Sequence, residues 1–126
     1  MAITQKRILV VDDEVVVCES LKMALESEDY ILESANSADE ALKKFDEAEF
    51  DLVLLDHFMA GTRGAELAQT LKARNNFLPV LMLTGTMPDR ELPAVDLVLL
   101  KPFELHDIRT TINKMLHEPC VMGLCS

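Results

Sequence analysis

Short apolar runs alternate with stretches of helical periodicity along the whole chain. The runs are wholly or mostly apolar, and we expect them to form strands. They occupy residues 8–11, 30–35, 52–55, 80–83 and 95–100. Between them, apolar residues recur every three or four positions, as in amphipathic helices. Apolar strands alternating with such helices are typical of a parallel sheet covered on both faces. The pattern therefore predicts an α/β domain with a doubly wound five-stranded parallel sheet.

The connection before the last predicted strand is unusually short. Pro88 and Pro93 enclose only residues 89–92. Four helical residues rise about 6 Å, whereas a five-residue strand runs about 16 Å. We therefore expect a shortened fourth helix that leaves the strand from Val95 to Leu100 as an apolar edge. Such an edge favours a homodimer or another protein partner. The alternative is that the loop and Met87 fold over it.

Polar side chains follow four of the five predicted strands. Asp12 and Asp13 follow the first, Asp56 the third, Thr84 the fourth and Lys101 the fifth. Loops often begin with polar residues, so one such residue would mean little. In open parallel sheets, however, ligands bind beyond the carboxyl ends of the strands. Three carboxylates, a hydroxyl and an ammonium group at one edge therefore indicate a functional site.

These residue types suit phosphoryl chemistry. Three neighbouring carboxylates repel one another, and Mg²⁺ is the hard cation that they would hold. A carboxylate can attack a phosphoryl group to give an aspartyl-phosphate, and Asp56 is the best placed for this. The ammonium group of Lys101 would hold a phosphoryl oxygen, and Thr84 could donate a hydrogen bond to another.

Composition narrows the class of partner and the compartment. The chain has 12 basic and 22 acidic residues, a net charge of −10, which disfavours nucleic acid and anionic membranes as partners. Its four glycines cannot form either common phosphate-binding loop. No apolar run reaches the roughly 20 residues of a membrane span. Three cysteines without a disulfide spacing favour a reducing compartment, so we expect a cytoplasmic protein.

Four motifs carry a resemblance to a known family. They are ILVVDDE at 8–14, LVLLDHFMAGTRG at 52–64, LMLTGT at 81–86 and LLKPF at 99–103. Together and in this order, they resemble the receiver domain of two-component response regulators. The resemblance implies a flavodoxin-like receiver fold. We place the receiver domain at residues 5–118 and a C-terminal tail at 119–126. Nine residues follow His117, so we expect a stand-alone receiver.

The resemblance implies roles for the acidic residues. Asp56 looks like the phospho-accepting aspartate, and it would share in holding Mg²⁺. Asp13 would bind the ion directly and Asp12 largely through water. The backbone carbonyl of Phe58 would be a further ligand.

The resemblance also implies roles for the remaining polar residues. Thr84 looks like the switch hydroxyl that moves to the phosphoryl oxygen. Lys101 looks like the lysine that pairs with the phosphoryl group, and the Lys101–Pro102 bond is usually cis in such proteins. The partners implied are a sensor histidine kinase or phosphotransfer protein as phosphoryl donor, and a downstream protein target.

Two positions bear on the choice of function. Val98 stands at a switch position where the family usually has an aromatic residue. Together with the short fourth helix, it favours a degenerate receiver that serves as an interaction module, whereas the complete set of acids and lysine favours phosphorylation. An aspartate-based Mg²⁺ phosphatase is the third alternative. It would need an acid–base carboxylate where Phe58 stands. His57 should point away from Asp56 on an extended chain, so we expect no catalytic role for it.

Overall fold

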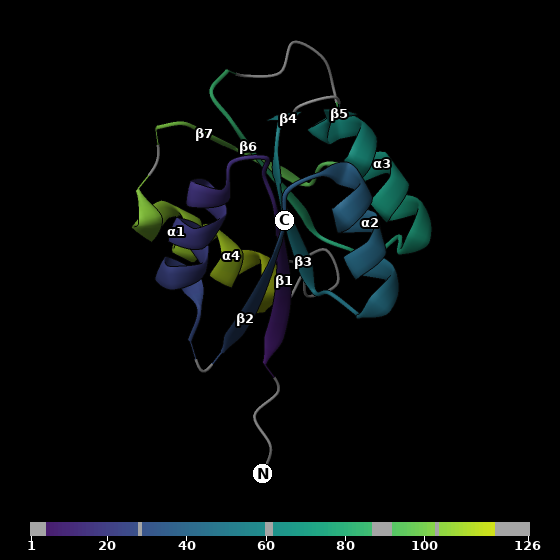
Figure 1. Ribbon diagram of the computed structural model, residues 1–126. Helices are drawn as coiled ribbons and strands as arrows, with labels where there is room; N and C mark the ends of the chain where they lie inside the picture. The colour runs from purple at the N-terminus through teal and green to yellow at the C-terminus, as the bar shows by residue number, and fades with distance from the viewer. Residues whose placement is uncertain (1–4, 28, 60–61, 87–91, 103, 118–126) are drawn as a thin grey trace, which may run out of the picture.

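The computed structural model describes residues 5–27, 29–59, 62–86, 92–102 and 104–117. The elements in chain order are β1 (Lys6–Val11), α1 (Val15–Leu25), β2 (Tyr30–Ala35), α2 (Ala38–Glu47), β3 (Leu52–Asp56), β4 (Phe58–Met59), β5 (Thr62–Arg63), α3 (Gly64–Arg74), β6 (Val80–Thr84), β7 (Leu97–Leu100) and α4 (Leu105–His117) (Figure 1). The proposed tail at 119–126 lies outside the described residues.

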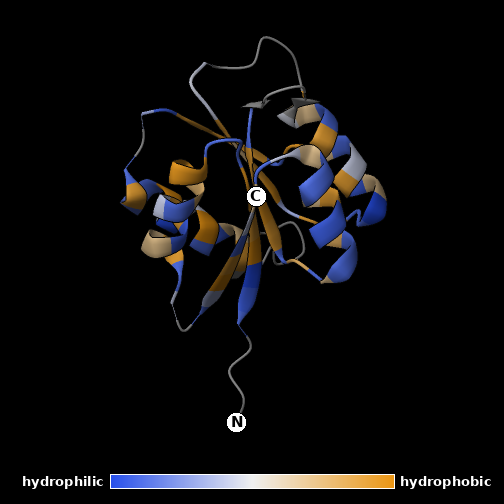
Figure 2. Ribbon diagram, viewed as in Figure 1, coloured by the Kyte–Doolittle hydropathy of each residue, from blue (hydrophilic) through white to orange (hydrophobic). Residues whose placement is uncertain are grey.

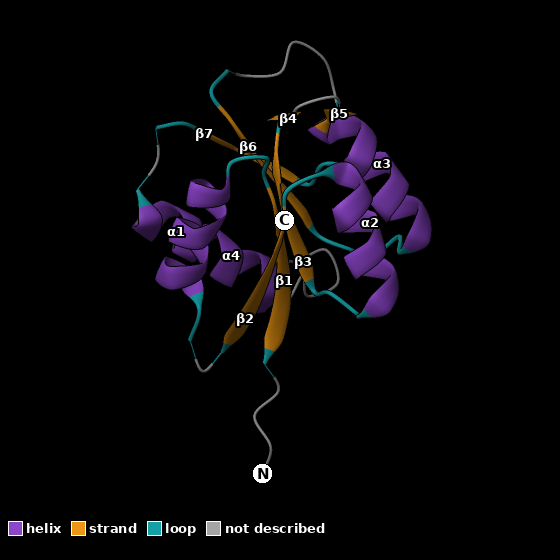
Figure 3. Ribbon diagram, in the orientation of Figure 1, coloured by secondary structure: helices purple, strands orange, loops and turns teal. Residues whose placement is uncertain are grey.

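Five of these strands form one parallel sheet in the order β2-β1-β3-β6-β7. Helices α1 and α4 lie on one side of the sheet and α2 and α3 on the other (Figure 3). This arrangement confirms the predicted doubly wound α/β fold. Strands β1 and β3 lie side by side in this sheet. The chain continues from β1 into α1 on one face and from β3 toward α3 on the other face.

The continuous apolar strands supply side chains to both faces of the sheet. Ile8 and Val10 pack with the apolar residues of α1 and α4, whereas Leu9 and Val11 pack with those of α2 and α3. Figure 2 shows the strands as mainly hydrophobic, whereas the helices carry hydrophilic and hydrophobic residues together. Because successive side chains of a strand point to opposite faces, a sheet covered on both sides requires apolar residues at every position.

Helix α2 begins with a capping box, in which two side chains accept from the backbone amides at the start of the helix. The Ser37 hydroxyl accepts from the amide of Glu40, and the Glu40 carboxylate accepts from the amide of Asn36. The side chain of Asn36 in turn donates to the backbone carbonyl of Asp12. The start of this helix is therefore connected to the end of β1.

A small antiparallel hairpin between β3 and α3 was not predicted. Strand β4 pairs with β5, Phe58 lying opposite Arg63 and Met59 opposite Thr62. The amide of Gly64 then donates to the carbonyl of His57, 2.9 Å away. The chain therefore turns back on itself directly after Asp56 before α3 begins.

Strand β7 forms one edge of the sheet. The expected short helix at 89–92 falls largely on residues 87–91, outside the described residues, and Leu92 is not helical. The side chains of Leu97 and Leu100 are each 43% exposed. As predicted, apolar side chains of this strand are accessible.

Candidate functional site

Strand register brings the sequence-predicted site residues to one end of the sheet. Val11 pairs with Leu55, so Asp12 and Asp56 follow at neighbouring strand ends. Asp56 pairs with Leu83 and Thr84 with Leu100, which places Thr84 and Lys101 beside them along the same edge. The four residues therefore lie together at the carboxyl ends of the strands, as the sequence predicts.

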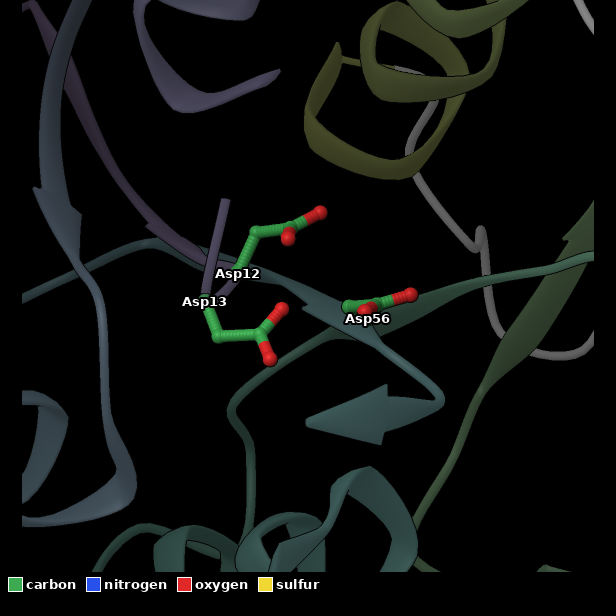
Figure 4. A group of neighbouring side chains, drawn as sticks. All are labelled: Asp12, Asp13 and Asp56. Carbon is green, nitrogen blue, oxygen red and sulfur yellow. The ribbon is translucent and has the colours of Figure 1, made fainter. Parts of the chain in front are cut away.

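The three carboxylates lie together at this edge. Asp12, Asp13 and Asp56 each offer an oxygen atom, and these atoms lie within 4.8 Å of one another (Figure 4). Asp12 is buried, Asp13 is exposed, and the side chain of Asp56 is 12% exposed. Asp12 therefore forms the floor of the cluster, while Asp13 borders the solvent.

Hydrogen bonds hold Asp12 from several directions. One carboxylate oxygen accepts from the amide of Glu14 at 2.9 Å. Its backbone amide donates to the carbonyl of Ala35 at 3.1 Å, and its carbonyl accepts from Asn36 Nδ2 at 3.0 Å. The Cys18 thiol lies beneath, with Sγ 3.5 Å from that carbonyl oxygen. Asp12 is thus fixed by β2 and by the starts of α1 and α2.

Burial makes the charged form of Asp12 costly. Burial is the main cause that raises the pKa of Asp12 to about 6, and the charges of Asp56 and Asp13 add to it. The Glu14 amide and the Lys101 ammonium act in the opposite direction. Burial and the charge of Asp12 likewise raise the pKa of the Cys18 thiol to about 11. The cluster therefore carries negative charge that its protein neighbours do not fully offset.

A magnesium ion fits this donor set. Carboxylate oxygens are the ligands that Mg²⁺ prefers in proteins, usually one or two of them together with waters and phosphate oxygens. Asp12, Asp13 and Asp56 supply three such groups, and a cation would offset the repulsion among them, which adds to the effect of burial on the pKa of Asp12. The carbonyl of Phe58 remains a predicted further ligand.

Lys101 contacts the carboxylate of Asp56. Its Nζ lies 3.4 Å from Asp56 Oδ1, and the Lys101 side chain is 39% exposed. The Lys101 backbone amide donates to the carbonyl of Thr84 at 2.7 Å, and the Lys101–Pro102 peptide is cis, as the resemblance implied. The cation and the carboxylate at the centre of the predicted chemistry are therefore neighbours.

The hydroxyl of Thr84 is buried and fully engaged. Thr84 Oγ1 donates to the carbonyl of Thr86 at 2.9 Å and is 3.3 Å from the Thr86 amide. His57 Nδ1 lies 3.0 Å from the same oxygen. Sequence reasoning took His57 only as a residue pointing away from Asp56 and missed this contact. Finding it requires the register of β3 against β6, in which Asp56 pairs with Leu83 and His57 therefore follows beside Thr84.

Val98 lies on β7 and pairs in register with Met82 of β6. It is half-buried. Its apolar side chain has no atom that could form a hydrogen bond with the Thr84 hydroxyl.

Comparison with known proteins identifies the class to which this fold and site belong. The chain matches the family described as the Response regulator receiver domain over residues 8–113. It is 33% identical over 117 residues to the transcriptional regulatory protein ResD of Bacillus subtilis, covering 89% of this chain and 48% of ResD. It is 35% identical to the regulatory protein VanR of Enterococcus faecium, covering 87% of this chain and 49% of VanR.

Solved structures agree in fold. A CheY-like response regulator receiver domain protein from Methanospirillum hungatei superimposes with a TM-score of 0.85 at 32% identity, covering 91% of this chain and 96% of that one. TrrA from Thermotoga maritima, solved in complex with Mg²⁺ and BeF, gives a TM-score of 0.81 at 36% identity, covering 89% of this chain and all of that one (100%).

A five-stranded parallel sheet with acids, a threonine and a lysine at its carboxyl edge is the architecture of a two-component receiver. The chain belongs to the response regulator receiver domain family. It spans about half the length of ResD and VanR (48% and 49%). No helix in the described part of the chain is both long and apolar enough to cross a membrane.

Proposed function

We propose that this chain is a phosphorylation-controlled receiver that takes a phosphoryl group on Asp56 and signals to a protein partner. One observation carries the proposal: Asp56 lies both in a cluster of three carboxylates and within 3.4 Å of the Lys101 ammonium. A carboxylate that serves only as a metal ligand needs no lysine, and one that serves only in an ion pair needs no acidic neighbours.

The proposed reaction is a transfer between two side chains. An oxygen of Asp56 attacks the phosphorus of a phosphohistidine, a P–O bond forms, and the P–N bond to the donor imidazole breaks. Lys101 holds a phosphoryl oxygen as negative charge gathers there. Asp12, Asp13 and Asp56 would hold Mg²⁺, which neutralises phosphoryl charge when bound. Thr84 donates its hydroxyl hydrogen to another phosphoryl oxygen after the transfer.

The phosphoryl donor in this proposal is a sensor histidine kinase or a phosphotransfer protein. A protein donor has to contact the edge of the sheet at which Asp56 lies. Val15 and Val16, at the start of α1 directly after the acidic residues, are 57% and 75% exposed. Exposed apolar side chains beside a reactive carboxylate suit docking of a protein surface. The downstream target is likewise a protein, since the net charge of −10 disfavours nucleic acid.

Magnesium dependence is part of the proposal. TrrA was solved with Mg²⁺ and BeF, and it shares 36% of its sequence with this chain. The motifs at 8–14, 52–64, 81–86 and 99–103 retain the acids, the threonine and the lysine that the receiver family uses.

The domain limits, the compartment and self-association remain proposals. We propose a receiver domain at 5–118 with a tail at 119–126, located in the cytoplasm. The exposed Leu97 and Leu100 of β7 support a homodimer through the segment from Val95 to Leu100.

The two alternatives have less support. A degenerate receiver would not need the complete set of Asp12, Asp13, Asp56 and Lys101 placed at one edge. An aspartate-based Mg²⁺ phosphatase would need an acid–base carboxylate at the position of Phe58.

One experiment separates these functions. The wild-type chain and Asp56→Asn are incubated with Mg²⁺ and acetyl phosphate, and the intact mass is followed with time. We expect a phosphoryl adduct on the wild type and none on Asp56→Asn. Asp39→Asn, the same change on exposed helix surface, is the matched control and should form the adduct normally.

Other outcomes contradict the proposal. Absence of the adduct from the wild type would favour the phosphorylation-independent interaction module. Turnover of phosphate esters by the wild type but not by Asp56→Asn would favour the phosphatase.

A further inference from the structure

We infer that His57 is a positioning residue that holds the Thr84 hydroxyl in its unphosphorylated arrangement. The phosphoryl group on Asp56 must then compete with His57 for that hydroxyl. This inference rests on the proposed function and adds a residue to it. It starts from one contact, the 3.0 Å separation of His57 Nδ1 and Thr84 Oγ1.

The bonds around Thr84 define the role of the imidazole. A hydroxyl has one hydrogen to donate and two lone pairs that accept. The hydrogen of Thr84 goes to the carbonyl of Thr86 at 2.9 Å, and one lone pair faces the Thr86 amide at 3.3 Å. His57 must therefore donate from Nδ1–H to the second lone pair. The hydroxyl is then saturated by His57 and Thr86.

Strand register shows why this arrangement opposes the phosphorylated one. Asp56 pairs with Leu83 across β3 and β6, and the amide of His57 donates to the carbonyl of Leu83. Because side chains alternate along a strand, His57 and Thr84 project on one side and Asp56 on the other. A Thr84 hydroxyl that donates to a phosphoryl group on Asp56 has to release the Thr86 carbonyl and turn from His57.

Burial strengthens the competition. Thr84 is 1% exposed, so water cannot readily replace a bond that the hydroxyl loses. His57 is half-buried beside it. When the hydroxyl turns, it therefore exchanges one set of protein hydrogen bonds for another. The hydrogen bond from His57 contributes to the free-energy difference between these two arrangements of Thr84.

The same exchange makes His57 a reporter of the state of Asp56. Val98, on the strand that follows, offers no polar atom to Thr84. His57 follows β3, the strand on the other side of β6, and comes directly after Asp56. Its Nδ1–H loses the Thr84 oxygen as acceptor when the hydroxyl turns. A change at Asp56 thereby alters the hydrogen bonding of the adjacent imidazole.

The test compares His57→Leu, His57→Asn and the wild type in titrations with beryllofluoride at saturating Mg²⁺. His57→Leu removes the donor, and we expect it to bind beryllofluoride about 3- to 10-fold more tightly, the range for one hydrogen bond. His57→Asn keeps an amide donor near the position of Nδ1 and should return the affinity toward the wild-type value. His106→Leu, on the exposed surface of α4, is the matched control.

The sign of the effect separates a positioning role from a merely structural one. Damage to the fold weakens binding, whereas loss of a competing donor strengthens it. A second readout is the ¹⁵N spectrum of the His57 imidazole. We expect a hydrogen on Nδ1 in the free protein and a changed Nδ1 signal when beryllofluoride binds.

Two negative results are distinguishable. If the wild type binds beryllofluoride and His57→Leu binds it equally or more weakly, the role of His57 is wrong while the proposed function stands. If the wild type binds none, the proposed function fails and the competition at Thr84 fails with it.

Discussion

Gly64 lies so close to Asp56 that a Cβ atom placed on it would be 2.3 Å from the Asp56 carbonyl oxygen. The same atom would be 3.3 Å from the Cα of His57. The glycine at the start of α3 therefore lets the helix approach the backbone that carries Asp56, the proposed phosphoryl acceptor. In the sequence, Gly64 is distinguished only as the last residue of the motif at 52–64.

Replacement of Gly64 by alanine should destabilise the protein. The new methyl group meets backbone atoms, which cannot move aside as a flexible side chain can. We expect Gly64→Ala to lower the free energy of unfolding by about 1–3 kcal/mol, as overpacking does. Gly85→Ala is the matched control, because a Cβ there meets nothing within 4 Å. Urea unfolding of both variants checks this, and equal stabilities would contradict the steric role of Gly64.

Lys101→Met should slow phosphorylation of Asp56 with little effect on folding. The Lys101 side chain is 39% exposed, so its ion pair with Asp56 contributes at most about 1 kcal/mol to stability. Loss of a cation where phosphoryl charge develops should lower the rate by about 100-fold. Adduct formation with acetyl phosphate measures this rate. Lys114→Met, on exposed helix surface, should behave as the wild type. Equal rates for the two variants would exclude Lys101 from the reaction.

Magnesium should stabilise the folded chain. An ion that binds the folded state at 100 times its Kd adds about 2.7 kcal/mol to the free energy of unfolding. We expect Mg²⁺ to raise the Tm at neutral pH, EDTA to reverse the increase, and Asp13→Asn to abolish most of it. Asp39→Asn should keep the wild-type response. A Tm that does not depend on Mg²⁺ in the wild type would contradict the metal site.

Stability of the metal-free protein should fall as the pH rises toward neutrality. The pKa of Asp12 is raised from 3.8 to about 6, so the folded state binds this proton more tightly than the unfolded state. Its stabilising contribution is fully present below 3.8 and is lost as the pH rises through about 6. Asp12→Asn should remove this dependence, which amounts to about 1–3 kcal/mol. Urea unfolding in EDTA at several pH values measures it, and parallel curves for wild type and variant would contradict it.

The edge strand β7 should support self-association. If copies of the chain pair through it, the sedimentation coefficient of the wild type rises with concentration, and Leu97→Lys lowers it toward that of a monomer. Phe77→Lys changes an exposed apolar residue elsewhere, 92% exposed, and should leave the association unchanged. A wild type that stays monomeric at high concentration, with and without beryllofluoride, would exclude this dimer.

The sheet, its layers and the edge that carries the site were predictable because they follow from local pattern. Strands apolar at every position require cover on both faces, and parallel strands deliver their following residues to one edge. Asp12, Asp56, Thr84 and Lys101 could therefore be grouped without knowledge of any contact. The capping box at Ser37 is also purely local.

The contacts that depend on exact register were not predictable in the same way. The bond between His57 and Thr84 needs the relative position of β3 and β6 to within one residue. Apolar runs at 52–55 and 80–83 leave that position open, because either run could slide by two residues and keep the same faces buried. The approach of Gly64 to Asp56 depends instead on the β4–β5 hairpin between them. The β4–β5 hairpin was missed because two residues per strand are too few to show alternation.

The separation of the acidic residues along the chain also orders the assembly of the protein. Asp12 and Asp13 follow β1, and Asp56 is the last residue of β3, with α1, β2 and α2 between them. The cluster cannot form until β3 has paired with β1. This pairing joins segments that are far apart in the sequence, and such non-local contacts form slowly. A chain that binds the cation through all three carboxylates has therefore already paired β1 with β3. The rate at which metal binding appears during refolding would report the rate of this pairing.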